Sequence, residues 1–214
     1  MRAARAAVAT ALLVVPCAGA HAAAVVCPAF ADRAGDVYDL WPYAGIPDDQ
    51  LDVRRGDIAG NKTTLTAQIT LTSLANTDPL APTGRGYSVI ADIGTGSLVE
   101  GPFVGFVATL DPLGNATFFA GEFRNPESDN AAMLWAVPAK GKVAGASIRV
   151  WVPYKAFAPR EIEIRSGMRV RRLWGEAGRH VPTDVVMGLT QIVDTGRGEI
   201  RYTLGKKACI PVGK

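Results

Sequence analysis

Histidine and glutamate are both scarce, and this limits the catalytic chemistry open to the chain. Only two of the 214 residues are histidine, His21 and His180, and the first lies in a leader-like N-terminus. One remaining imidazole cannot form a two- or three-histidine metal centre. A Ser-His-Asp triad would have to use His180, which lies in a predicted surface loop, and no serine has a nucleophile-elbow pattern. The sequence therefore does not predict a catalytic histidine.

The glutamates are scattered along the chain instead of paired. Glycoside hydrolysis needs two carboxyl groups on either side of the bond that is cut. The glutamates are Glu100, Glu122, Glu127, Glu161, Glu163, Glu176 and Glu199. This spread favours a non-catalytic protein, with a carboxylate-based extracellular hydrolase as the alternative.

Beyond the N-terminal segment, no apolar run is long enough to span a bilayer. Within that segment, two arginines precede an apolar stretch over residues 6–15, and small residues follow. This layout predicts a secretory signal peptide over residues 1–24, cleaved after Ala22 or Ala24, and a secreted or extracellular location. An uncleaved anchor helix is the alternative, but the run is short and Pro16 interrupts it.

Loss of the signal peptide would leave a nearly neutral chain. The full sequence has 23 Lys+Arg and 20 Asp+Glu, which gives a net charge of +3. Two of the arginines and none of the acids lie in the leader, so the mature chain would carry +1. So small a charge attracts a phosphate backbone weakly, which argues against a nucleic-acid partner. Residues 160–214 are richer in Lys and Arg, and a basic face that meets an anionic surface is a further alternative.

Cysteine is scarce as well, and only Cys27 and Cys209 follow the leader. They lie near the two ends of the mature chain. In an oxidising compartment we expect one disulfide that ties the first strand to the last, with two buried free thiols as the alternative. Chain-entropy models assign such a closure about 4–5 kcal/mol, less any strain in the folded state.

Helical periodicity is absent after the leader, and alternating apolar residues take its place. Over residues 64–74, Leu65, Ala67, Ile69 and Leu71 alternate with threonine and glutamine, which predicts a half-buried antiparallel strand. Further strands are predicted over residues 87–93, 103–110, 116–123, 135–137, 147–152, 161–173 and 200–204, with one helical turn over 152–157.

Glycine and proline punctuate these runs. Turn signals occur at residues 60–61, 82–84, 94–96, 111–115, 141–142 and 196–198. Many short strands, in a chain with 23 glycines and 14 prolines, are typical of a sandwich or barrel. Because there is no repeat, linker or break in composition, residues 25–214 are predicted to form a single antiparallel β-sandwich of jelly-roll-like type.

Acidic residues are concentrated near the start, and seven of the 20 fall between Asp32 and Asp57. Crowded carboxylates repel one another unless a cation or water screens them. Gly35 lets the backbone turn between Asp32 and Asp36, and Asp52 stands at the start of a predicted strand. Hard oxygen ligands of this kind indicate a cation such as calcium. The alternative is ordinary turn chemistry, because aspartate caps local backbone groups.

Aromatic residues are few, and three of them are candidate ligand-binding residues. Trp41 and Tyr43 lie in the loop after the acidic string, and Trp174 precedes a glycine in another predicted loop. An exposed Trp or Tyr can stack on a sugar ring or an apolar ligand. The alternative is that these rings cap the ends of the sandwich.

The chain also contains an ordered set of segments: residues 27–30, 32–36, 51–53 and 65–71, followed by Asp194 and residues 200–205. In this order they resemble DOMON domains and family 9 carbohydrate-binding modules, which are exported β-sandwich domains.

That resemblance implies a structural calcium ion near a sandwich edge. Asp32, Asp36 and Asp52 would be side-chain ligands, Gly35 would offer its carbonyl, and Asp194 would approach from the last strands. Haem-binding DOMON domains use Met and His ligands, and His180 is at no matching position. We therefore expect a secreted non-catalytic binding domain, with structural calcium and a glycan or cell-surface polymer as ligand. A purely structural or adhesive exported protein is the remaining alternative.

Overall fold

The computed structural model describes residues 27, 29–37, 48–79, 81–94, 103–124, 132–180 and 191–213. The predicted signal peptide over 1–24 lies outside the described residues, as do the candidate ligand residues Trp41 and Tyr43. Within the described ranges, no helix is both long enough and apolar enough to cross a membrane.

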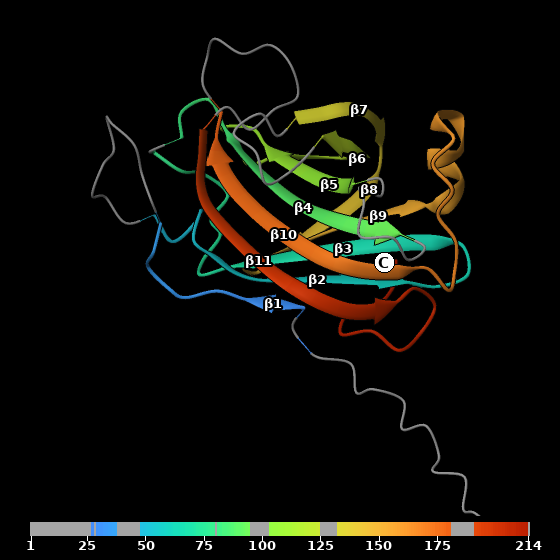
Figure 1. The fold of residues 1–214 in the computed structure, drawn as a ribbon. Coiled ribbons are helices and arrows are strands. Elements are labelled where there is room, and N and C mark those ends of the chain that lie inside the picture. Colours follow the sequence, from blue (N-terminus) through green and yellow to red (C-terminus); the bar gives the residue numbers. More distant parts are fainter. Residues whose placement is uncertain are drawn as a thin grey trace, which may run out of the picture.

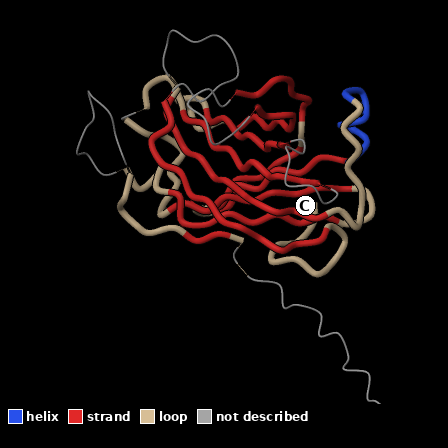
Figure 2. Tube along the Cα trace, viewed as in Figure 1, coloured by secondary structure: helices blue, strands red, loops and turns tan. Residues whose placement is uncertain are grey.

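Two antiparallel sheets form a sandwich (Figure 1). The five-stranded sheet has the order β1 (Phe30–Ala31), β2 (Val53–Gly60), β3 (Thr64–Leu71), β9 (Ser147–Pro153) and β8 (Lys140–Ala144). The six-stranded sheet has the order β11 (Gln191–Thr203), β10 (Arg169–Arg179), β4 (Arg85–Gly94), β5 (Phe103–Leu110), β6 (Ala116–Arg124) and β7 (Ala132–Pro138). Strands dominate both layers, and the described part has one short helix, η1 (Tyr154–Arg160) (Figure 2). The predicted all-β sandwich is confirmed.

The core lies between the sheets, where the alternating apolar residues of one meet those of the other. Leu65 and Ile69 of β3 and Tyr87 and Val89 of β4 are all nearly inaccessible and belong to one apolar cluster. Burial of such side chains stabilises the fold by about 1.5–3 kcal/mol each.

The prediction that β3 is half-buried is wrong, because its second face is covered too. Thr66 is fully buried, and its hydroxyl accepts a hydrogen bond from the Gly213 N–H of the C-terminal tail at 2.9 Å. Gln68 on the same face accepts two hydrogen bonds from the guanidinium of Arg149 in the neighbouring strand. The polar half of the alternation therefore faces other parts of the chain, and its polar atoms are satisfied there.

The predicted strand over residues 161–173 is wrong in its first half. Glu161 has a left-handed backbone, with φ of 58°, and ends helix η1. Strand β10 begins only at Arg169 and runs on to Arg179, so that Trp174 lies in a strand and not in the predicted loop. The helical turn predicted over residues 152–157 is confirmed in part: η1 begins at Tyr154 and runs to Arg160, and residues 152–153 end strand β9.

The turns predicted at residues 141–142 and 196–198 are also wrong, because these glycines lie inside strands β8 and β11. They are needed for close packing. A Cβ on Gly141 would lie 2.2 Å from the ring of Phe118, and a Cβ on Gly196 would lie 2.5 Å from the ring of Phe30. Glycine in a strand interior can mark such an approach as well as a turn.

The predicted disulfide is confirmed. Cys27 and Cys209 are bonded with their Cα atoms 5.5 Å apart, across a sequence separation of 182 residues. The bond joins the segment before β1 to the segment after β11 and closes almost the whole domain into one loop.

Candidate metal centre

An N-terminal arm (residues 29–37) carries the first part of the candidate centre. It runs along β2, where the Asp32 N–H donates to the Arg54 carbonyl at 2.9 Å. At its start, the Ala29 N–H donates to the carboxylate of Asp57 at 3.0 Å. These contacts fix the arm beside the first long strand of the five-stranded sheet.

Phe30 anchors the arm in a glycine slot, formed by Gly56, Gly175, Gly196 and Gly198. Its side chain is 4% exposed. A Cβ added at any of the four glycines would lie between 2.1 and 2.7 Å from an atom of Phe30. Because the glycines come from β2, β10 and β11, the ring wedges the arm between the two sheets. The acidic residues that follow Phe30 are thereby placed against β11.

Three carboxylates converge at this point. Asp36 of the arm, Asp52 just before β2 and Asp194 of β11 each offer an oxygen, and these oxygens lie within 4.8 Å of one another. Gly35, with φ of 74°, makes the turn that delivers Asp36. Sequence reasoning named all three aspartates, and the fold brings them together.

Asp52 is the best-positioned group of the three. It is 1% exposed, and its Oδ2 accepts hydrogen bonds from the Gly35 N–H at 3.0 Å and the Thr72 hydroxyl at 2.5 Å. Its Oδ1 is buried and has no hydrogen-bond partner in the described part of the chain. A buried carboxylate oxygen without a partner is unfavourable, and a bound cation would satisfy it.

Asp194 is held by two backbone donors. Its Oδ2 accepts from the Val53 N–H at 2.6 Å, and its Oδ1 accepts from the Thr195 N–H at 2.8 Å. Burial raises the pKa of Asp194 to about 6, with the nearby carboxylates of Asp32 and Asp36 adding to the rise and the two backbone bonds opposing it. A cation would remove this penalty by favouring the ionised form.

Asp32 was predicted as a ligand, but it lies outside the group of three. Its Oδ1 accepts from the Arg33 N–H at 2.9 Å. Burial raises the pKa of Asp32, and the charges of Asp36 and Asp52 raise it further, while Arg54 lowers it. Asp32 therefore adds to the negative potential of the centre, and Arg54 offsets part of it.

The arrangement suits a hard cation. Its donors are carboxylate oxygens, with no sulfur or imidazole among the three, and one donor, Asp36, is exposed. That open side leaves room for water to complete a coordination shell of six to eight oxygens, as calcium needs. The Gly35 N–H donates to Asp52, and the Gly35 carbonyl stays a predicted ligand.

Thr72 is the residue of this site that sequence reasoning missed. Its hydroxyl binds Asp52 Oδ2, and its N–H donates to the Asp52 carbonyl at 2.9 Å. In the sequence it is one of several threonines on the polar face of a strand, and only the pairing of β2 with β3 distinguishes it.

Of the predicted aromatic ligand-binding residues, only Trp174 is placed in the described structure. Trp174 is buried in β10, where it packs edge-on against Phe103 at 5.6 Å and under the guanidinium of Arg172 at 5.1 Å. Trp174 is only 6% exposed, so we do not retain it as a ligand platform. Trp41 and Tyr43 lie outside the described residues.

His180 follows β10 and is half-buried. Its N–H donates to the Gly84 carbonyl, and burial lowers the pKa of its ring, opposed by a hydrogen bond with the backbone of Arg85. In the described residues the ring has no serine or aspartate partner, as a catalytic triad would require.

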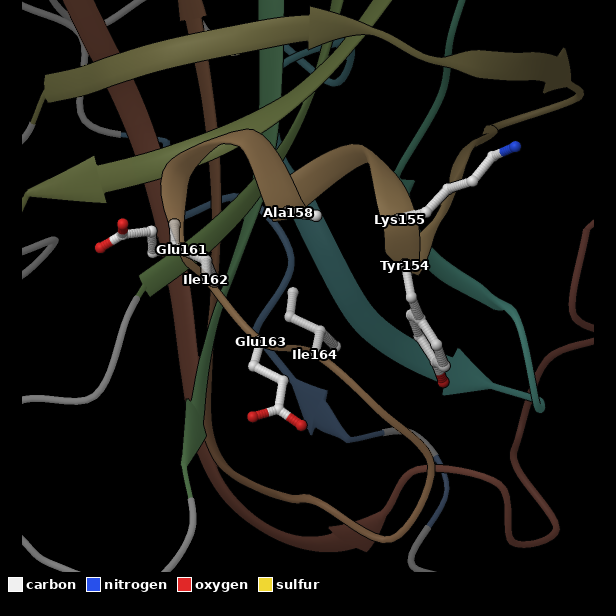
Figure 3. Close-up of a pocket in the computed structure, with 7 residues that line it drawn as sticks. All are labelled: Tyr154, Lys155, Ala158, Glu161, Ile162, Glu163 and Ile164. Atoms are coloured by element: carbon white, nitrogen blue, oxygen red, sulfur yellow. The ribbon is translucent and has the colours of Figure 1, made fainter.

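A hollow of about 280 Å³ lies beside η1. It is lined by Tyr154, Lys155, Ala158, Glu161, Ile162, Glu163 and Ile164 (Figure 3). The charged ends of Lys155 and Glu161 point away from the hollow in that view. Ligand sites usually have polar groups that converge, so we assign no ligand to it.

Comparison with known proteins found no match to a family model, to a curated protein or to a solved structure.

Proposed function

We propose that this chain is an exported, non-catalytic binding domain whose Asp36, Asp52 and Asp194 hold a structural calcium ion. The main support for the ion site is Asp52 Oδ1. This oxygen is buried in a group of three carboxylates and lacks a hydrogen-bond partner among the described residues. An acidic turn alone would be explained by local backbone capping. Local capping does not explain why carboxylates from three separate segments converge on a buried oxygen without a hydrogen-bond partner.

The proposed role of the ion is to fasten the arm and the two sheets together. Asp36 belongs to the arm, Asp52 leads into β2 of one sheet, and Asp194 belongs to β11 of the other. Calcium fits better than zinc or copper because the donors are all hard oxygens. Binding to the folded state alone would raise stability by mass action.

Calorimetric titration after chelation tests the ion. We expect calcium to bind the wild-type chain and to raise its melting temperature, with magnesium weaker. Asp52→Asn should abolish both effects. Asp49→Asn is the matched control, since Asp49 is an exposed aspartate of the same acidic stretch that is not one of the three. Equal calcium responses of Asp52→Asn and wild type would refute the site.

The proposed ligand is a glycan or cell-surface polymer. Support for it comes from the leader-like N-terminus, the absence of a catalytic set in the sequence, and the aromatic pair Trp41 and Tyr43. Binding of the full chain to an array of extracellular polysaccharides should be lost in Trp41→Ala and kept in Trp174→Phe. Binding that survives the loss of both Trp41 and Tyr43 would contradict this part of the proposal.

A further inference from the structure

The N-terminal arm is fastened at both of its ends. Two residues before it, Cys27 is bonded to Cys209. Near its other end, Asp36 contributes to the group of three carboxylates. Cys27 is an exposed residue, and a thiol reductant opens the disulfide by attack on one of its sulfurs.

Between these two attachments the arm is held by the pairing of β1 with β2, by backbone hydrogen bonds to Arg54 and Asp52, and by the Phe30 side chain. Its strand, β1, is two residues long, and the residues at positions 31 and 33–36 are exposed. Phe30 supplies the one large buried side chain. Ordering the arm costs conformational entropy at every residue, and so little burial offsets only part of that cost. The docking of the arm therefore depends in part on the attachments at its two ends.

We infer that the disulfide and the cation are thermodynamically coupled through the arm, so that reduction of Cys27–Cys209 weakens cation binding and the bound cation protects the disulfide. The inference rests on the proposed calcium site. When the disulfide is lost, the docked state of the arm is less populated. The apparent affinity for the ion then falls in proportion to the fraction of molecules in which the arm is docked. By linkage, the ion must stabilise the disulfide by the same factor.

The redox step is thiol–disulfide exchange with a dithiol. One thiolate of the dithiol attacks a sulfur of the disulfide and forms a mixed disulfide, which the second thiolate resolves. The dithiol is oxidised to its cyclic disulfide, and the sulfurs of Cys27 and Cys209 together take up two electrons and two protons. No metal is oxidised or reduced, because the ion acts only by holding Asp36 in place.

The alternative is that Phe30 alone keeps the arm docked. If its ring in the glycine slot is sufficient to keep the arm docked, the cation affinity will be independent of the disulfide. The two cases are distinguished by measuring the coupling in both directions on the full chain.

The first measurement is calcium titration of the wild-type chain with the disulfide formed and after reduction by dithiothreitol, with circular dichroism to follow the fold. We expect the dissociation constant to rise by about tenfold on reduction, within the usual range of coupling between sites. An unchanged dissociation constant would overturn the inference while leaving the proposed ion site intact. Global unfolding on reduction would also overturn it, since the arm would then not be the coupling element. If the oxidised chain takes up no calcium, the proposed site itself fails.

The second measurement needs no reduced protein at the outset. The dithiothreitol concentration that reduces half of the disulfide is measured with saturating calcium and with magnesium at equal ionic strength. Calcium should raise it by the same factor, about tenfold. In Asp36→Asn calcium should have no effect. A calcium shift that persists in Asp36→Asn, or no shift in the wild type, would overturn the coupling.

Discussion

Asp194 Oδ2 accepts a hydrogen bond from the Val53 N–H at 2.6 Å, which joins β11 of one sheet to the start of β2 in the other. The same carboxylate is one of the three proposed calcium ligands. It thus has a structural partner before any ion binds. The opposite oxygen is held by Thr195, so that both oxygens are oriented by backbone donors. A carboxylate fixed in this way loses little entropy when it takes a cation.

Stability should depend on pH through Asp194. In the cation-free chain burial raises the pKa of Asp194 from the ordinary 3.8 to about 6. Between these two pH values the folded state keeps a proton on Asp194 that the unfolded state has lost. Stability from this group is therefore present at low pH and decreases as the pH rises from about 4 to about 6. Urea unfolding with a chelator present should show this decrease.

Two comparisons isolate Asp194 from other titrating groups. In Asp194→Asn the decrease should be smaller, and in wild type with saturating calcium it should be reversed, because calcium binds the ionised carboxylate. The same pH dependence in wild type and Asp194→Asn would count against this assignment.

Thr72→Val should weaken calcium binding although Thr72 is not a proposed ligand. The substitution removes the hydroxyl that orients Asp52 Oδ2 and leaves that oxygen with one donor. We expect a loss of about 1–2 kcal/mol in the free energy of unfolding and a weaker affinity for calcium. The control is Thr70→Val, which removes the hydrogen bond to Ser147 away from the centre. Calorimetry should show a change of affinity in the first variant alone.

Gly56→Ala should displace Phe30 from the glycine slot. The new Cβ would lie 2.1 Å from the ring of Phe30, so the arm must move or the strand must shift. Overpacking of this kind costs about 1–3 kcal/mol. In a Phe30→Ala background the same substitution should cost much less, because the ring is absent. Additive effects in this double-mutant cycle, measured by urea unfolding, would show that the clash is not the cause.

Glu161→Gly should stabilise the fold. Glu161 is the one described non-glycine residue with a positive φ, and glycine adopts that backbone without strain. After the greater entropy loss of glycine is subtracted, we expect a net gain of about 0.5–1 kcal/mol. Glu163→Gly, two residues on, serves as control, since Glu163 is exposed and has no positive φ. It should be neutral or destabilising, and a gain in both variants would refute the strain argument.

The fold class was accessible from sequence because alternation of apolar residues is a local signal. Leu65, Ala67, Ile69 and Leu71 point to one face of any extended strand, whatever the rest of the chain does. The glycines of β11 show where local reading fails. Gly196 and Gly198 look like a turn, but they lie in a strand that pairs with β10, and Phe30, far away in sequence, packs against them.

For the candidate centre too, some features could be predicted from the sequence and others could not. The sequence by itself determined the residue types: three aspartates with hard oxygen donors, a glycine that permits the turn before Asp36, and two cysteines for one bond. Only the tertiary structure decided which aspartates meet, because Asp194 reaches Asp52 through the packing of one sheet on the other. It also decided that Asp32 is not one of the three aspartates whose oxygens converge, that the Thr72 hydroxyl donates to Asp52, and that Trp174 is buried. Those outcomes depend on contacts between residues distant in sequence, which no local pattern contains.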